Sequence, residues 1–269
     1  MEHPASVRRV NSSGVVDETG GSVARRVSTL LRIVGSAVPA GLSTTEAARR
    51  SGLNRSTTHR LLTALAEDGF LDRDPDHGTW FLGPEVYLLG ALAAERYDIR
   101  HLAAERLRVL AEATGESAYL SVRRGSETVC LQEREGSFPL RSMVLHEGVR
   151  FPLGVASAGM VILAFLPERE AEAYLADGHL ERDRGPVYSV SAVRERAAET
   201  RRTGYALNPG LVLEGSWGLG AAVFDGSGRP AWALSLTGVE SRIRDRHEQL
   251  GALLLQQAHI LTKDLQRRG

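Results

Sequence analysis

The sequence predicts an α+β protein with two domains, a small winged helix-turn-helix followed by a larger domain of mixed strands and helices. Its length of 269 residues corresponds to about two ordinary domains. The first part of the chain shows helical periodicity in three segments and then two short strands around a turn, which is the element order of a winged helix. The second part alternates between strand and helix patterns, which indicates an α+β or α/β sensor-like domain.

The composition is that of an ordinary globular chain, with 42% hydrophobic and 25% charged residues, and excludes disordered and fibrous classes. No apolar run reaches the roughly 18 residues of a membrane-spanning helix, and the N-terminus lacks a signal-peptide pattern. The single cysteine, Cys130, excludes an intramolecular disulfide. We therefore expect a cytoplasmic protein without a membrane partner, and a disordered polar tail over residues 1–21.

Local signals define the first two helices of the winged domain, which we place at residues 22–84. Apolar residues recur at helical steps over 23–34, and a Pro-Ala-Gly sequence at 39–41 ends that helix. Residues 43–46 read Ser-Thr-Thr-Glu, the S-x-x-E form of a capping box. This motif predicts a second, short helix that ends at Gly52.

A third helix is predicted from Asn54 to Gly69, with positions 58, 61, 62 and 65 on its buried face. Strands at 70–73 and 79–82 then flank a turn rich in Pro, Gly and Asp, which predicts the hairpin that forms the wing.

Positive charge is concentrated in this domain, although the chain as a whole is neutral with 33 basic and 33 acidic residues. Residues 21–66 contain seven arginines and one glutamate, a net charge of +6; the arginines are Arg25, Arg26, Arg32, Arg49, Arg50, Arg55 and Arg60. Such a segment attracts phosphates and releases their counterions. Charge alone leaves open a solvated basic face, and the helix-turn-helix pattern in the same segment favours DNA.

The third helix carries polar and basic groups opposite its buried face. Arginine donates to two acceptors on guanine in the major groove, and small hydroxyls near a helix N-terminus suit phosphates. The wing adds groups that reach the backbone or minor groove. We expect DNA contacts from Arg25, Arg26, Ser43, Thr44, Arg55, Ser56, Thr57, His59, Arg60, Thr63, Arg73, His77 and Thr79. For His59, a solvated surface position is the alternative to a base contact.

A linker helix over residues 85–100 is predicted to join the second domain, residues 101–269. After a helix at 101–113, the patterns predict strands at 118–123, 128–133, 140–144, 149–153, 219–224 and 231–237. Further helices are predicted at 156–165, 168–177, 190–203 and 245–266.

One strand of this domain has the pattern of a pocket floor. Read with a period of two, its apolar face consists of Trp232, Leu234 and Leu236, and its other face is small and carries two hydroxyls. The helix start near residues 155–159 adds backbone N–H groups that bind anions. A solvent face or a tight helix-packing face is the alternative for this strand.

The motifs do not favour an enzyme. The spacing Gly154-x-x-Ser157-x-Gly159 lacks the form of a nucleophile elbow, and Gly218-x-Gly220 is not a dinucleotide fingerprint. The histidines show no metal-binding spacing, and Cys130 lies within a strand pattern as a core residue. We expect no catalytic residue, no metal and no cofactor. The alternatives left open are a winged-helix protein-interaction module without operator specificity and an enzyme domain fused to a winged helix.

Several segments resemble the IclR family of bacterial transcriptional regulators. They are 42–62 (LSTTEAARRSGLNRSTTHRLL), 67–71 (EDGFL), 80–84 (WFLGP), 150–153 (RFPL), 204–206 (GYA), 221–225 (AAVFD) and 233–238 (ALSLTG). The resemblance covers nearly the whole chain after the tail. It implies a winged helix-turn-helix, a linker helix, a GAF-like effector-binding domain, and dimers or tetramers on operator DNA.

Matched motif by motif, the resemblance implies effector-binding positions at Ser157, Ala158, Asn208, Gly218, Ser235 and Thr237. Asn208 stands where an aspartate is common in the family, Gly218 where a cysteine is common, and Gly154 where a histidine is frequent. The first difference replaces an acceptor with a donor and acceptor, and the glycines open space. We therefore expect an effector larger or less acidic than glyoxylate or pyruvate.

Together these patterns predict a ligand-responsive repressor or activator that reads a pseudo-palindromic operator in double-stranded DNA as a homodimer or tetramer. The effector is expected to be a small organic acid or an aromatic compound.

Overall fold

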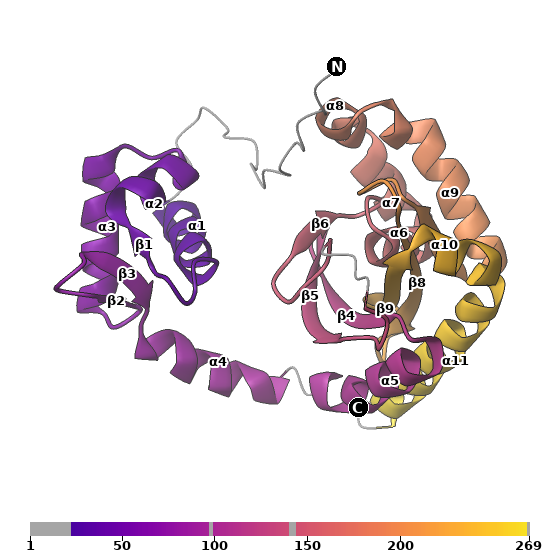
Figure 1. Cartoon of the computed structure of the whole chain (residues 1–269). Coiled ribbons are helices and arrows are strands. Elements are labelled where there is room, and N and C mark those ends of the chain that lie inside the picture. Colours follow the sequence, from indigo (N-terminus) through magenta and orange to yellow (C-terminus); the bar gives the residue numbers. More distant parts are fainter. Residues whose placement is uncertain (1–22, 97–98, 140–143, 268–269) are drawn as a thin grey trace, which may run out of the picture. The chain divides into compact units, whose positions relative to one another are not determined.

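The computed structural model describes residues 23–96, 99–139 and 144–267, in two compact units that divide between Arg96 and Tyr97 (Figure 1). Each unit is described by itself. The tail predicted over 1–21, and most of the strand predicted at 140–144, lie outside the described residues.

The first unit is a winged helix-turn-helix built on helices α1 to α3 and a three-stranded antiparallel sheet in the order β1-β3-β2. Its elements are α1 (Val23–Gly35), β1 (Leu42–Ser43), α2 (Thr44–Ser51), α3 (Arg55–Glu67), β2 (Leu71–Arg73), β3 (Thr79–Leu82) and α4 (Pro84–Arg96). Leu30, Leu62, Leu71 and Trp80 form its core, each no more than 1% exposed. Leu61, predicted to be buried, packs only partly against this core.

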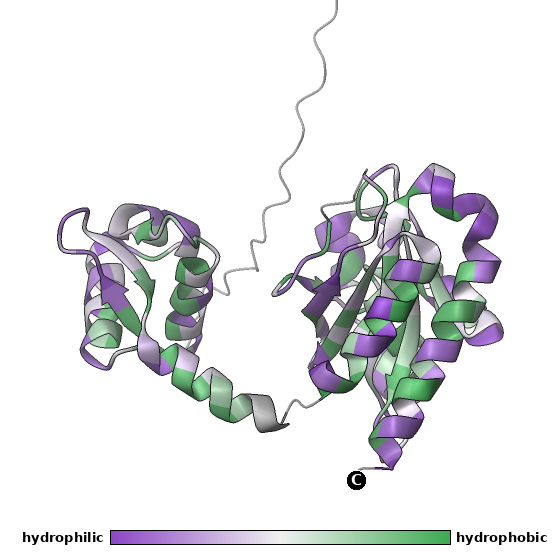
Figure 2. Ribbon diagram, turned by 60° about the horizontal axis from the view of Figure 1, so that its bottom comes forward, coloured by the Kyte–Doolittle hydropathy of each residue, from purple (hydrophilic) through white to green (hydrophobic). Residues whose placement is uncertain are grey.

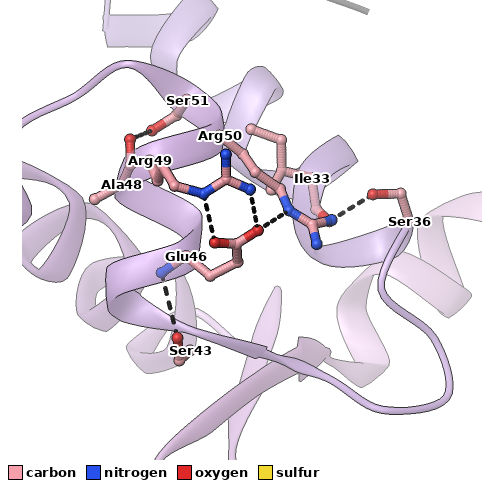
Figure 3. Close-up of polar contacts among 8 residues, drawn as sticks. All are labelled: Ile33, Ser36, Ser43, Glu46, Ala48, Arg49, Arg50 and Ser51. Carbon is pink, nitrogen blue, oxygen red and sulfur yellow. Dashed lines mark hydrogen bonds and ion pairs between the residues drawn. The ribbon is translucent and has the colours of Figure 1, made fainter. Parts of the chain in front are cut away.

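Side-chain caps determine where α2 and α3 begin. The Ser43 hydroxyl accepts from the Glu46 backbone N–H at 3.2 Å, and the Asn54 side chain accepts from the Thr57 N–H at 2.8 Å. Gly52, with φ of 70°, ends α2 in the left-handed conformation that permits the tight turn. The capping box is one-sided, because the Glu46 carboxylate bonds to two arginines rather than returning to Ser43 (Figure 3).

The second unit contains a six-stranded sheet in the order β6-β5-β4-β9-β8-β7, with every pair antiparallel. Its strands are β4 (Ser117–Arg124), β5 (Glu127–Arg134), β6 (Arg150–Pro152), β7 (Tyr205–Pro209), β8 (Ser216–Phe224) and β9 (Pro230–Val239). Antiparallel pairing throughout makes the domain α+β, so the predicted fold class is confirmed and the α/β alternative is excluded.

Helices cover both faces of the sheet (Figure 1). One face packs against α5 (Ile99–Thr114) and α11 (His247–Gln266), and the other packs against α6 (Ser157–Phe165) and α9 (Val190–Thr203). The remaining helical segments are α7 (Glu168–Leu175), α8 (His179–Arg184), η1 (Pro186–Tyr188), α10 (Glu240–Ile243) and η2 (Arg244–Arg246). The alternation predicted for β9 holds, since Leu234 and Leu236 face the α5 and α11 side while Ala233 faces α6.

The first turn of α6 lies directly on β8 because two glycines of that strand carry no side chain. A Cβ atom at Gly220 would lie 2.6 Å from the Ser157 carbonyl oxygen, and one at Gly218 would lie 3.2 Å from the Ser157 hydroxyl oxygen. The glycines therefore bring the start of α6 close to the sheet.

Substitution of Gly220 tests this contact. Gly220→Ala should destabilise the second unit by about 1–3 kcal/mol, because the new methyl group forces α6 away from β8. Gly226→Ala is the matched control, since a Cβ there meets nothing within 4 Å. Urea unfolding of the full chain, followed by circular dichroism, measures the effect, and identical unfolding midpoints for the two variants would contradict the packing argument.

Candidate nucleic-acid interface and ligand cavity

The face of α3 opposite the core presents the predicted recognition residues to solvent. Arg55, Ser56, His59 and Arg60 are exposed, and Thr57 and Thr63 are half-buried. Neither Arg55 nor Arg60 has an ion-pair partner within the described ranges. Their charge is therefore available to an external anion. Because Asn54 caps α3, the first turn also begins in a fixed geometry beside these two side chains.

The positive charge counted in the sequence is partly neutralised on α2. Glu46 receives hydrogen bonds from Arg49 at 2.7 Å and from Arg50 at 2.7 Å (Figure 3). These bonds lower the pKa of Glu46 to about 2, so the carboxylate stays charged at any physiological pH. Two of the seven arginines thus share one internal partner, whereas Arg55 and Arg60 on α3 have no carboxylate partner among the described residues. Arg25 and Arg26 lie on α1, at its first turn.

Ser43 and Thr44, which we predicted to contact DNA, have roles within the fold. The Ser43 hydroxyl caps α2, and the Thr44 hydroxyl accepts from the Trp80 indole N–H at 2.9 Å. That second bond joins the start of α2 to the wing strand β3. Each hydroxyl keeps its own hydrogen for a further acceptor.

The three predicted wing residues lie on or beside the hairpin. The Arg73 guanidinium lies 5.4 Å from the centre of the Trp80 ring, and His77 bonds to the Asp74 carboxylate at 3.0 Å. Thr79 is half-buried at the start of β3. His59 of α3 also contacts the wing strand β3, since its ring meets the Trp80 ring edge-on with centroids 6.3 Å apart.

Acidic residues dominate the tip of the wing. Asp72 and Asp76 are exposed and Asp74 is half-buried, whereas Arg73 is the one basic residue between them. Three carboxylates repel phosphate groups. The hairpin therefore carries more negative than positive charge, unlike the exposed face of α3, and the sequence analysis did not take this into account.

A cavity of about 30 Å³ lies in the second unit between the sheet and the first turn of α6. All six residues predicted to bind an effector line it: Ser157, Ala158, Asn208, Gly218, Ser235 and Thr237. The volume is enough for roughly one or two water molecules. A ligand as large as a benzene ring therefore requires the lining side chains to move outward.

One end of the cavity is rich in hydrogen-bond donors. Ser235 is 1% exposed, and its hydroxyl has no hydrogen-bond partner among the described residues. The N-cap residue of α6, Ala156, offers no side-chain bond to the first turn, so backbone N–H groups there remain for a ligand. A buried polar group without a partner is uncommon in native folds and indicates a site for a ligand or water.

Asn208 has a structural role beside the cavity. Its side-chain amide donates to the Val155 carbonyl at 2.8 Å and accepts from the Leu211 N–H at 2.9 Å, which ties β7 to the loop before α6. One N–H and one lone pair of the amide remain for a ligand.

The expectation that Gly154 enlarges the cavity is wrong. Gly154 does not line it, and a Cβ there would lie 3.2 to 3.4 Å from Leu163, Val193 and Leu180 in the core. A glycine suits this position because the backbone φ is 84°, a left-handed conformation that other residues rarely adopt. The room next to Gly218 is also limited, because the Ser157 hydroxyl lies beside it.

The sequence reading missed the opposite wall of the cavity, formed by Ser121, Thr128 and Cys130 on β4 and β5. Apolar side chains such as Val149, Phe151 and Trp217 complete the lining, which includes no charged side chain within the described ranges. A period-two reading of β4 and β5 would have grouped these residues on one face, but pairing with β9 is needed to relate that face to Ser235. Cys130 is buried as predicted, and burial raises the pKa of its thiol to about 12.

In the part of the chain that the structure describes, no helix is long and apolar enough to cross a membrane. No group of three or more His, Cys, Asp or Glu side chains within those ranges is placed to hold a metal ion.

A winged helix with an exposed basic recognition face, followed by a sheet domain with a buried polar cavity, defines a DNA-binding regulator with an effector domain. Comparison with known proteins gives the family. The IclR helix-turn-helix domain matches residues 23–75, and the C-terminal domain of the bacterial transcriptional regulator IclR matches residues 91–262. The chain belongs to the IclR family of transcriptional regulators.

Two curated relatives come from Escherichia coli K12. The transcriptional repressor IclR is 29% identical over 222 residues, which cover 81% of each chain. The regulator XynR is 31% identical over 207 residues, which cover 76% of this chain and 81% of XynR.

Solved structures share the fold. A regulator from Alicyclobacillus acidocaldarius has a TM-score of 0.75 and 24% identity, covering 89% of this chain and 97% of its own. An IclR homologue from Microbacterium hydrocarbonoxydans was solved in complex with 4-hydroxybenzoate. It has a TM-score of 0.74 and 22% identity, and the match covers 92% of this chain and 100% of the homologue.

The reactivity of Cys130 tests the buried cavity wall. Because the thiolate is the nucleophile and the thiol pKa is about 12, iodoacetamide at pH 8 should modify the native protein at least about 100-fold more slowly than the protein in guanidinium chloride. Mass spectrometry of the intact chain follows the reaction. Equal rates in the two states would show that Cys130 is accessible and the cavity wall is not formed.

Proposed function

We propose that the chain regulates transcription by reading a pseudo-palindromic operator through α3, and that a small organic effector bound in the second-unit cavity changes this binding. The observation that carries the proposal is the exposed face of α3. There Arg55 and Arg60 have no carboxylate partner in the described part of the chain, whereas Arg49 and Arg50 are paired with Glu46. A rigid helix with two available guanidinium groups suits guanine edges in the major groove.

The contacts proposed around α3 follow from the groups that remain available. Arg55, Ser56 and Thr57 lie in its first turn, where backbone N–H groups and the helix dipole favour a phosphate. Arg60, with His59 and Thr63 beside it, lies further along the same helix and is assigned to base edges. Arg25 and Arg26 on α1 would add phosphate contacts.

The wing contributes less than α3 in this proposal. Arg73, His77 and Thr79 can reach DNA, but Asp72, Asp74 and Asp76 oppose a close approach of the hairpin to the phosphate backbone. Arg73 is also held over the Trp80 ring.

The effector is proposed to be an organic monocarboxylate with an apolar body. The first turn of α6 and Ser235 supply donors for one carboxylate, and the lining holds no charged side chain to balance a second one. An IclR homologue from Microbacterium, solved in complex with 4-hydroxybenzoate, supports an aromatic acid as one candidate. Asn208, in place of an acidic side chain, also favours binding of an anion.

The chain is proposed to act as a homodimer that uses α4. This helix exposes Tyr87, Leu88, Leu89 and Leu92 at 77%, 51%, 48% and 70%, and Figure 2 shows it as hydrophobic over most of its length. An apolar helix in water is unfavourable unless another surface covers it. A second copy provides that cover and supplies the second recognition helix that a pseudo-palindrome requires.

Substitution of Arg60 tests the DNA interface. Fragments of the source genome selected by the full chain supply the operator, and gel shifts over a salt series measure its affinity. Arg60→Ala should weaken binding by roughly 5- to 150-fold, as expected for loss of a bidentate base contact. Arg49→Ala, which removes an arginine already paired with Glu46, should weaken binding much less. Equal losses for the two variants would contradict the assignment to α3, and an absence of DNA binding at every salt concentration would favour a protein-interaction module.

Substitution of Leu92 tests the dimer. Sedimentation velocity should show the wild-type chain as a dimer or larger and Leu92→Asp with weakened association, because a carboxylate in an apolar interface is not solvated. Val187→Asp is the control, since Val187 is an exposed apolar residue (42%) of the second unit. An unchanged mass for Leu92→Asp would exclude α4 as the interface.

A further inference from the structure

The cavity has a second polar wall across the sheet from Ser235. In the strand register, Tyr119 of β4 pairs with Ser235, and Ser121 pairs with Ala233. Ser121 is therefore the diagonal neighbour of Ser235 on the same face, at about 7–8 Å. Cys130 of β5 pairs with Ser121 and continues the line by one more strand. Thr128 follows Cys130 on that face. Ser235, Ser121, Cys130 and Thr128 line the cavity, whereas Tyr119 and Ala233 do not.

The hydrogen bonds already made by this wall limit what it offers a ligand. The Thr128 hydroxyl donates to the Phe151 carbonyl at 3.3 Å, and the Cys130 thiol donates to the Gln132 carbonyl at 3.7 Å. Both groups therefore present lone pairs, rather than hydrogens, to the cavity. Ser121 is 2% exposed, and no hydrogen bond of its hydroxyl is found among the described residues, so this hydroxyl can accept from a ligand or donate to one.

The two ends of the cavity therefore differ chemically. The end at α6 and Ser235 presents donors, whereas at the other end Thr128 and Cys130 present acceptors beside the Ser121 hydroxyl, which can accept or donate. Apolar side chains, among them Val149 and Phe151, lie between the ends. A ligand that satisfies both ends has an anionic or acceptor group at one end and a hydrogen-bond donor at the other.

We infer that Ser121, Thr128 and Cys130 form a distal specificity site that selects an effector with a donor, such as a hydroxyl group, at the end opposite its carboxylate. The inference rests on the proposed effector role of the cavity and narrows the ligand class to hydroxylated monocarboxylates with an apolar body. It excludes dicarboxylates, because a second charge at the distal wall would be buried without a partner. It also disfavours ethers and esters at that position, because they carry no hydrogen for the Thr128 and Cys130 acceptors.

A matched ligand series tests the distal site on the wild-type full chain. Benzoate and phenylacetate are each compared in three forms, unsubstituted, 4-hydroxy and 4-methoxy, with pyruvate, glyoxylate and terephthalate as further arms. Calorimetry gives the affinities. On at least one scaffold, the 4-hydroxy acid should bind about 10-fold or more tightly than its 4-methoxy partner, because an unpaired buried polar group is costly. Equal affinities for the two forms, or binding of only the keto acids or terephthalate, would overturn the inference.

Variants assign the preference to the named residues. Ser121→Ala and Thr128→Val should each reduce the preference for the hydroxy acid over the unsubstituted acid by about fivefold or more, with both affinities measured on the same variant. Thr237→Val, at the α6 end, is the control and should weaken all acids of a scaffold alike. Persistence of the full preference in both distal variants would overturn the assignment. If a variant does not fold, as shown by circular dichroism, the hydroxy-to-methoxy comparison on the wild type decides.

Different results would contradict the distal site and the proposed function as a DNA-binding regulator. A chain that binds its selected operator but shows no hydroxyl preference fails the distal inference and leaves the DNA-binding proposal intact. A chain that binds a hydroxylated acid but no DNA fails the proposed function, and the distal site stands.

Discussion

The second unit depends on the close contact between the first turn of α6 and strand β8. Gly218 and Gly220 remove the side chains that would hold the helix away, and the Ser157 backbone fills the space. This contact places the start of α6 at one wall of the cavity, which Ala156, Ser157 and Ala158 line together with Ser235. A side chain at Gly220 would push the start of α6 away from the sheet, because its Cβ would lie 2.6 Å from the Ser157 carbonyl oxygen and α6 packs on both β8 and β9.

In the first unit, some arginines are paired with carboxylates and others are not. On α2, Arg49 and Arg50 donate hydrogen bonds to the Glu46 carboxylate. In the wing, Arg73 lies between Asp72 and Asp74 in the sequence. Among the described residues, Arg55 and Arg60 on α3 have no carboxylate partner of this kind. The positive charge that the first unit offers to an external anion is therefore smaller than the +6 of residues 21–66 suggests, and the proposed interface on α3 includes two of its arginines.

The sequence was informative where a local pattern determines structure. The serine and asparagine before α2 and α3 predicted both helix starts, and the small hydroxyl-bearing face of β9 predicted one side of the cavity. Contacts between distant parts of the chain could not be predicted in the same way. The bond from Trp80 to Thr44 spans 36 residues, and it gives a residue read as a DNA contact a role in anchoring the wing. The position of Gly154 against Leu163 and Val193, and the alignment of Ser121 with Ser235, likewise require the packed helices and the strand register.

Strand β4 offers a short route between the cavity and the chain segment that leads to the winged helix. Ser121 faces the cavity, while its neighbour Leu120 lies in the core shared with α5, and α5 begins at Ile99 shortly after α4 ends. An effector that widens the cavity can act on this route only if it binds two arrangements of the protein with different affinity. The most direct test is the Kd of the full chain for its selected operator, with and without a saturating concentration of the best-binding hydroxylated acid. The account predicts a change of about fivefold or more. An unchanged Kd, with thermal stabilisation showing that the cavity is occupied, would contradict it.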